Sequence, residues 1–381
     1  MAEARNAYRA AGVDVDAGEA AVELMRAAVE STRRPEVVGS LGGFAAAVGL
    51  PAGFRDPVLV SSTDGVGTKT AIAGALRRFD TIGRDLVAMC ADDVVCSGAG
   101  PLFFLDYIAV GRVAPEDVAE LVEGIAAGCR EASCALVGGE TAEHPGLIEP
   151  GGFDLAGACV GIVERDELLD GTAAGAGDVV IGVASNGLHA NGYSLVRTLI
   201  EQWQLDLARP YQEQLRLTLG DREADSAIAA EPGHTLATLG DVLLTPTEIY
   251  VGRLLAARAR LRQAGTDLHG LAHITGGGLP GNVPRMVGAE LGVRLDPGRW
   301  RVPSVISLFA ALGGLDAEEL RATFNGGLGM TVAVAPEAAA SALETLRSEG
   351  LDAHTVGEVV PIAELDGRRY VEGPMSATVR L

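Results

Sequence analysis

Short apolar runs alternate along the chain with longer stretches in which apolar positions recur every three or four residues. The short runs predict β-strands at residues 58–61, 103–110, 135–137, 156–163 and 178–184. The longer stretches predict helices at about residues 16–34 and 81–97, and others that start near Pro115 and Ser194. Because strands and helices alternate, the pattern predicts an α/β (α+β) fold.

A break in this pattern divides the chain. Residues 166–177 are rich in Gly and Ala and carry no apolar period, which predicts two domains at residues 1–170 and 171–381. The segment 205–235 is polar and lacks a clear period, so it predicts a surface insertion. No repeat of 20–50 residues is found.

Composition narrows the possible partners. The 381 residues carry a formal net charge of −21, which argues against nucleic acid or an anionic membrane surface. No apolar run approaches the roughly 20 residues that span a bilayer, and the N-terminus does not resemble a signal peptide, so we expect cytoplasmic residence. A small anion must then be held locally, by backbone amides, helix N-termini, a metal ion or a few cations.

The cysteines do not predict a disulfide framework or a zinc site. There are five, an odd number, and none forms a C-x-x-C pair. We expect them to be small buried hydrophobic residues in a reducing compartment.

One cation stands out because 29 of the 30 basic residues are Arg and only Lys69 is Lys. Lys69 follows Asp64-Gly65-Val66-Gly67-Thr68, a Gly-containing turn between a predicted strand and a helix. Such turns let backbone amides approach an anion, and a compact ammonium suits a tight phosphate site. The alternatives are a chance surface lysine and a turn in which Asp64 only caps the helix.

Three acids are candidate ligands for a metal ion. On a helical wheel, Asp93 falls about 20° from Ile82, within an apolar face, so it is either a structural acid with a partner or a metal ligand. Asp64 and Glu140 each follow a predicted strand beside glycines. Carboxylates at the ends of elements suit magnesium, which bridges to phosphates.

Two Gly-rich segments in the second half are candidate anion cradles. Asn186 to Gly192, with His189 and Asn191, joins a predicted strand to a helix, and Thr275 precedes three consecutive glycines. The alternative is a turn that needs Asn and Gly only for left-handed backbone. The P-loop, dinucleotide-binding and nucleophile-elbow motifs are absent from the sequence.

Several motifs together resemble the phosphoribosylformylglycinamidine cyclo-ligases, also called aminoimidazole ribonucleotide synthetases. They include S-T-D-G-V-G-T-K at 62–69, L-V-G-G-E-T-A-E at 136–143, N-G-Y-S-L-V-R at 191–197, T-G-G-G at 275–278 and F-N-G-G at 324–327. The D-x-x-x-x-G-A-x-P signature is present as Asp93, Gly98, Ala99 and Pro101. The matches run in order along nearly the whole chain.

The resemblance implies a reaction in purine biosynthesis. ATP would phosphorylate the formyl oxygen of formylglycinamidine ribonucleotide, and a substrate nitrogen would then close the imidazole ring. It implies a homodimer whose N-terminal domains form a β-barrel, with a mixed-sheet α/β domain at the C-terminus. ATP and Mg²⁺ are the implied cofactors, and a role for K⁺ is left open.

The resemblance also assigns residues. It implies catalytic roles for Asp93, Lys69 and His189, and metal binding by Asp64, Asp93 and Glu140. The implied nucleotide site consists of Asp64, Gly65, Val66, Gly67, Thr68, Lys69, Asp93, Gly138, Gly139, Glu140 and Thr141. The implied substrate side consists of Asn186, His189, Asn191, Thr275, Gly276, Gly277 and Gly278. Asp92 departs from the family, which often has Asn there, so two adjacent acids compete for the metal role.

Two other functions have to be considered. Thiamin-monophosphate kinases and selenophosphate synthetases are related, but the former usually carry an early Gly-Asp-Asp element and the latter a reactive Cys or selenocysteine in an early loop. This chain has neither, since its first cysteine is Cys90. A non-catalytic, dimeric nucleotide-binding regulator would bind ATP without turnover.

Overall fold

The computed structural model describes residues 9–39, 42–231 and 237–375. Residues 40 and 41 of the first Gly-rich stretch and residues 232–235 of the expected insertion lie outside this part. The chain forms two compact units. The first consists of the residues up to Val94 together with Gly100–Arg165, and the second of Val95–Ala99 together with the residues from Asp166 onward.

The first unit is built on a four-stranded sheet with the order β3-β6-β4-β5. Its strands are β3 (Pro57–Gly65), β4 (Gly100–Val110), β5 (Ala135–Glu143) and β6 (Phe153–Glu164). The β4–β5 pair is parallel and the other pairs are antiparallel. β3 and β5 are the edges and do not pair with each other, so the sheet is open.

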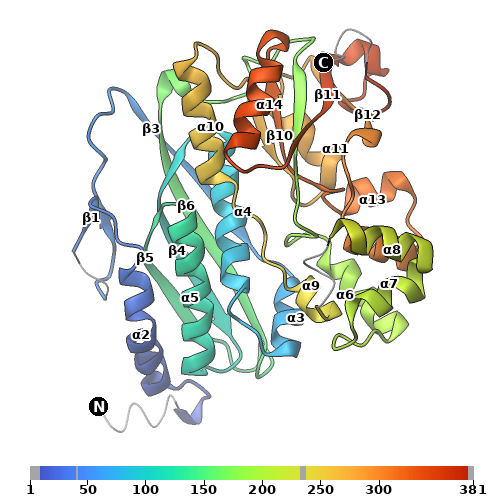
Figure 1. Ribbon diagram of the computed structural model, residues 1–381. Helices are drawn as coiled ribbons and strands as arrows, with labels where there is room; N and C mark the ends of the chain where they lie inside the picture. The colour runs from blue at the N-terminus through green and yellow to red at the C-terminus, as the bar shows by residue number, and fades with distance from the viewer. Residues whose placement is uncertain (1–8, 40–41, 232–236, 376–381) are drawn as a thin grey trace. The chain divides into compact units, whose positions relative to one another are not determined.

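Helices cover one face of this sheet (Figure 1). They are α2 (Val15–Glu30), α3 (Lys69–Leu76), α4 (Ile82–Cys96) and α5 (Pro115–Glu131), and α2 packs along α5. A short ladder of β1 (Val37–Val38) with β2 (Ala47–Val48) follows α2. The opposite face is uncovered, and it exposes Leu59, Leu105 and Tyr107 by 56%, 37% and 41%.

The second unit contains a six-stranded sheet with the order β12-β9-β11-β7-β10-β8. The strands are β7 (Val179–Ala184), β8 (Gly270–His273), β9 (Leu291–Leu295), β10 (Leu328–Val334), β11 (Ala353–Pro361) and β12 (Tyr370–Glu372). Only the β12–β9 pair is parallel among the described strands, so the sheet is mixed.

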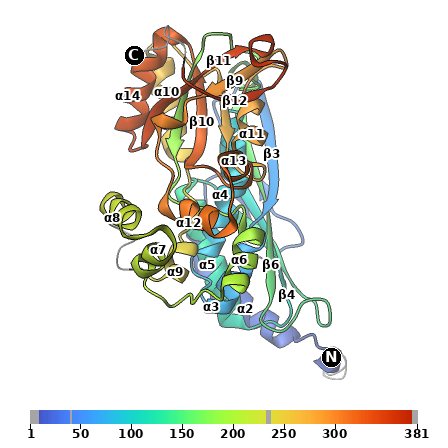
Figure 2. The same cartoon turned by 90° about the vertical axis from the view of Figure 1, so that its right-hand side faces the viewer.

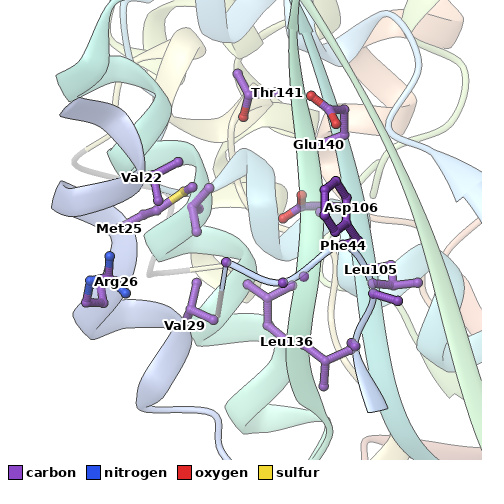
Figure 3. Close-up of a pocket in the computed structure, with 18 of the residues that line it drawn as sticks. Val22, Met25, Arg26, Val29, Phe44, Leu105, Asp106, Leu136, Glu140 and Thr141 are labelled. Carbon is purple, nitrogen blue, oxygen red and sulfur yellow. The ribbon is translucent and has the colours of Figure 1, made fainter. Parts of the chain in front are cut away.

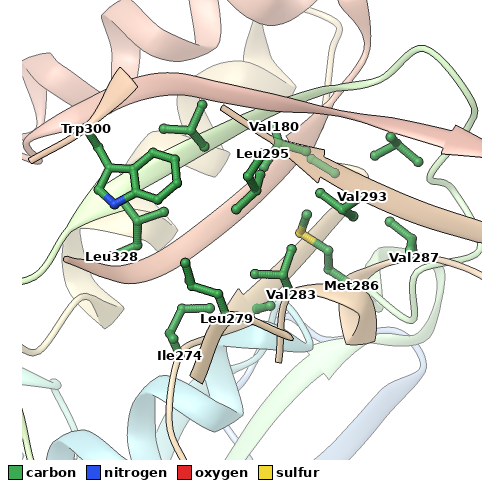
Figure 4. Packing of buried hydrophobic residues seen from close by; sticks show 14 residues of the cluster. Val180, Ile274, Leu279, Val283, Met286, Val287, Val293, Leu295, Trp300 and Leu328 are labelled. Atoms are coloured by element: carbon green, nitrogen blue, oxygen red, sulfur yellow. The ribbon is translucent and has the colours of Figure 1, made fainter. Parts of the chain in front are cut away.

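The larger helices of the second unit are α6 (Tyr193–Trp203), α10 (Val251–Gln263), α12 (Ser304–Gly313) and α14 (Ala339–Ser348). Shorter helices are α9 (Leu239–Leu243), α11 (Gly278–Asn282) and α13 (Ala317–Thr323). In Figure 2, α14 and α10 lie together beside the sheet. One cluster of buried apolar side chains, which includes Val180, Ile274 and Leu328, packs around Trp300 (Figure 4).

The expected insertion at 205–235 contains two helices, α7 (Tyr211–Leu219) and α8 (Asp221–Ala230). All five cysteines are free, and only Cys96 is not fully buried. Among the described residues, no helix is both long and apolar enough to cross a membrane.

Two predicted strands are longer in the structure than the pattern indicated. β5 continues to Glu143 and β3 continues to Gly65. Glu140 and Asp64 therefore lie inside strands, which corrects the expectation that they follow them. Glycines at 138 and 139 do not end β5 because its register with β4 is kept up to the Val110–Glu143 pair.

Candidate functional site

A cavity of about 1560 Å³ lies at the β5 edge of the sheet in the first unit. It is bounded by α2, by the segment from Val37 to Val48 and by β4 and β5 (Figure 3). The four predicted nucleotide residues Gly138, Gly139, Glu140 and Thr141 line it. The cavity therefore brings the L-V-G-G-E-T segment against residues that the motifs did not single out.

Much of the cavity wall is apolar. Val22, Met25 and Val29 project from α2, and Leu136 adds to the wall from β5. Phe44 lines the cavity while its side chain remains fully exposed, at 114%. An apolar cavity with a few polar groups is the usual form of a site for a small organic molecule.

Asp106 is the most unusual polar group in this cavity, and sequence reasoning missed it. It lies in the middle of β4, and burial raises its pKa from 3.8 to about 7. Its register partner on β5 is Gly139. A signal was available, because Asp106 is the only charged residue in the predicted strand at 103–110.

The predicted phosphate turn lies elsewhere in the first unit, at the end of β3. Asp64 accepts a hydrogen bond from the amide of Gly65 at 2.7 Å. Asp93 on α4 accepts one from the hydroxyl of Ser62 at 3.3 Å. Ser62 and Asp64 are two residues apart on one strand and so share a face, which places Asp64 and Asp93 on the same, helix-covered side of the sheet.

Lys69 is buried at the start of α3. Its ammonium and the carboxylate of Asp85 on α4 are 2.9 Å apart, and both side chains are 0% exposed. Burial lowers the pKa of Lys69, while Asp85 opposes this shift. The structure thus places Lys69 in the packing between two helices, and the predicted phosphate contact remains a prediction.

Burial does not single out Asp93 on α4. Asp85 and Asp92 are both 0% exposed, whereas Asp93 is half-buried. The helical wheel assumed one apolar face and one solvated face. In the structure α4 is buried on nearly all sides, so its acids lie in protein on several sides of the helix.

The single chain does not bring the three predicted metal ligands together. Asp64 pairs with Gly157 on β6, Gly157 with Asp106 on β4, and Asp106 with Gly139 on β5. Glu140 is one residue past this row, so its side chain leaves the opposite face, at the far edge from β3. Among the described residues, no group of three or more Asp, Glu, His or Cys side chains could hold a metal ion.

The substrate motifs of the second unit meet at one end of its sheet. β10 lies between β7 and β8, with Leu328 opposite Ala184 and Met330 opposite His273. The loops that follow β7 and β8 and the loop that precedes β10 therefore converge. These are the segments 185–192, 274–278 and 324–327.

Two asparagines hold these loops. Asn325 donates to the carbonyl of Gly187 at 2.8 Å and accepts from the amide of Gly327 at 2.9 Å. Asn282 donates to the carbonyls of Thr275, Gly276 and Gly278 at 2.8–3.2 Å. Sequence reasoning missed both residues, although Asn325 was inside a quoted motif.

The predicted substrate residues occupy these loops. A side chain at Gly276 would contact Asn191 at 3.6 Å, so the two motifs are adjacent. Gly278 has φ 59° and lies so close to the Arg321 carbonyl that a Cβ would be 1.8 Å from it. His189 is buried, has φ 62°, and lies 6.1 Å from the Tyr250 ring. Asn186 donates to the carbonyl of Pro246 at 3.0 Å.

Comparison with known proteins identifies the family. Models for AIR synthase related proteins match at residues 45–163 for the N-terminal domain and 175–367 for the C-terminal domain. A phosphoribosylformylglycinamidine cyclo-ligase of Thermosynechococcus vestitus is 49% identical and covers 93% of this chain and 96% of its own. The enzymes of the same name from Gloeobacter violaceus and Sorangium cellulosum are 48% and 47% identical, over 93% and 94% of this chain and 98% and 96% of theirs.

Solved structures support the fold alone. Thiamine-monophosphate kinase from Stenotrophomonas maltophilia superposes with a TM-score of 0.61 at 17% identity, covering 94% of this chain and 97% of its own. The hydrogenase maturation protein HypE of E. coli gives 0.58 at 20% identity, with 89% of each chain covered. The family resemblance that the motifs indicated is confirmed: this chain belongs to the phosphoribosylformylglycinamidine cyclo-ligase family.

Proposed function

We propose that this protein is an ATP-dependent cyclo-ligase of purine biosynthesis. It converts formylglycinamidine ribonucleotide and ATP into 5-aminoimidazole ribonucleotide, ADP and phosphate. The observation that carries the proposal is 47–49% identity to cyclo-ligases over more than nine-tenths of the chain. The reaction needs a nucleotide side and a substrate side, and each unit supplies one cluster of family motifs.

The chemistry asks mainly for positioning and for charge neutralisation. The formyl oxygen attacks the γ-phosphorus of ATP, and ADP leaves. A nitrogen of the substrate then attacks the activated carbon, the ring closes, and the phosphorylated oxygen departs as phosphate. Phosphoryl transfer of this kind is accelerated by orientation and by cations at the phosphates rather than by covalent catalysis.

We assign the nucleotide to the first unit. The adenosine part occupies the cavity lined by Gly138 to Thr141, and the phosphates bind near the turn from Asp64 to Thr68. Mg²⁺ suits the donors here, because Asp64, Asp93 and the hydroxyl of Ser62 offer only oxygen atoms on one side of the sheet. Bound Mg²⁺ would neutralise phosphate charge in a chain whose net charge is −21.

We assign the phosphorylated substrate to the loops of the second unit. The turn from Thr275 to Gly278 can offer backbone amides to an anion, and Asn191 is adjacent to it. His189 is the candidate for a proton-transfer or orienting role there, because it lies on the same loop as Asn191.

The proposal includes a cytoplasmic homodimer. The uncovered face of the first unit exposes Leu59, Leu105 and Tyr107, and a second copy packed on it would bury them. Two open sheets joined in this way would form a barrel without free edges. Glu140 projects from this face, so a dimer would also allow acids from two copies to serve one nucleotide.

The decisive experiment is turnover by the purified protein. With formylglycinamidine ribonucleotide and magnesium ATP, we expect equal amounts of ADP and a diazotisable aminoimidazole. ADP release that does not require the ribonucleotide would indicate a simple ATPase. Nucleotide binding without any product would favour a regulator, and would contradict the cyclo-ligase assignment.

A further inference from the structure

We infer that Asp106 recognises the base of the nucleotide by accepting a hydrogen bond from the exocyclic amine of adenine. This rests on the proposed function, in so far as that function assigns adenosine to the cavity of the first unit. It adds a specificity-determining residue that the family motifs did not assign. The inference stands on the position of the carboxyl group, the walls around it and the residue opposite.

Gly139 makes room for the carboxyl group. A Cβ at position 139 would lie 1.7 Å from Oδ1 of Asp106 and 2.7 Å from its Cγ. The carboxyl of Asp106 therefore fills the volume that any other residue at 139 would occupy. Its seat is formed by two neighbouring strands of one rigid sheet, which is how specificity groups are held in place.

The surroundings of Asp106 suit a flat aromatic ligand. In Figure 3 its carboxyl lies between the α2 side chains Val22 and Met25 and the ring of Phe44. Apolar groups on both sides can cover the faces of a base, while a polar group between them meets its edge. The structure thus supplies the walls and the reader of a base site in one place.

Adenine offers a donor at its edge, and Asp106 offers an acceptor. The amine of adenine donates hydrogen bonds, whereas hypoxanthine has a carbonyl oxygen at the same position. A carboxylate would accept from the amine and repel the carbonyl. The apolar surroundings that raise the pKa of Asp106 also strengthen such a bond, because water does not compete for it.

Asp106→Ala is a suitable test because it should fold. It removes a carboxyl whose ionised form is disfavoured by burial, and leaves no buried partner unsatisfied among the hydrogen bonds described for Asp106. Asp106→Asn keeps an amide oxygen as acceptor and should restore recognition. Gly139→Ala should displace the carboxyl without removing it. Asp154→Ala is the matched control, since Asp154 lies on the adjacent strand β6 and is exposed.

Calorimetry with magnesium ATP and magnesium ITP measures the preference without requiring turnover. We expect the wild-type protein and Asp154→Ala to bind ATP at least about tenfold more tightly than ITP, the effect of one hydrogen bond to a charged group. Asp106→Ala and Gly139→Ala should bring the ratio to within about twofold, chiefly through weaker ATP binding, and Asp106→Asn should recover most of it.

The outcomes separate the two proposals. A folded Asp106→Ala variant with the wild-type ratio overturns the inference, as does a wild-type protein without preference for ATP. Either result leaves the cyclo-ligase function intact if product still forms. Conversely, a preference that depends on Asp106 in a protein without ring-closing turnover would uphold the base site and refute the proposed function.

Discussion

Breaking the ion pair between Lys69 and Asp85 should destabilise the first unit far more than its size suggests. Both side chains are 0% exposed, and their charged atoms are 2.9 Å apart. We choose Asp85→Asn, which keeps the shape of the side chain, and Lys69→Met, which keeps most of its length. Each leaves one buried charge without its opposite charge.

The expected loss is about 3–5 kcal/mol in the free energy of unfolding for each single variant, the usual cost of leaving one member of a buried pair. The double variant should lose less than the sum of the two, because no unpaired charge remains. The exposed pair of Arg77 and Asp117, with side chains 68% and 29% exposed, is the control. Asp117→Asn should cost less than about 1 kcal/mol.

The assay has to report on the first unit. Trp203 and Trp300 both lie in the second unit, so tryptophan fluorescence during urea unfolding follows that unit and serves as an internal reference. Hydrogen exchange of the α3 and α4 amides follows the ion pair directly. We expect faster exchange in both helices of Asp85→Asn. Wild-type exchange in this variant, or additive losses in the double variant, would refute the reasoning.

Three further results are expected. Asp93→Asn should lose most turnover yet unfold at the wild-type urea concentration, and a wild-type rate would return Asp93 to a structural role. Gly278→Ala places a Cβ 1.8 Å from the Arg321 carbonyl at φ 59°, so substrate affinity should fall at least about tenfold, which calorimetry with the ribonucleotide can check. The pKa of Asp106 rises from 3.8 to about 7 on folding, so stability is fully present below pH 3.8 and is lost as pH rises through 7. The loss is at most about 4 kcal/mol, and urea unfolding of Asp106→Asn between pH 5 and 8 should lack that slope.

The strands and helices could be predicted where their apolar pattern was strong. The predicted helix at 81–97 is α4 (Ile82–Cys96), and the predicted strand at 178–184 is β7. The ends of β3 and β5 could not be predicted, because glycine normally signals a turn. Neighbouring strands hold Gly65 and Gly138 in a ladder, and such pairing is a property of the sheet rather than of the segment.

The candidate site was predictable in part. The motifs named Gly138 to Thr141, which do line the cavity, and the T-G-G-G and H-A-N-G segments, which do lie side by side. Asp106 was missed because one acid in an apolar strand has no periodicity of its own. Asn282 and Asn325 were missed because their bonds to the loops exist only after those loops converge.

By itself, the sequence determined the alternation of strands and helices, the acidic character and the family, because these depend on residue order and composition alone. Only the tertiary structure decided which side chains meet. Lys69 looked like a phosphate ligand from its place in a turn, and packing of α3 against α4 gave its ammonium a buried carboxylate instead. Asp64 and Glu140 looked equivalent, yet strand register and the twofold alternation of side chains send them to opposite faces of one sheet.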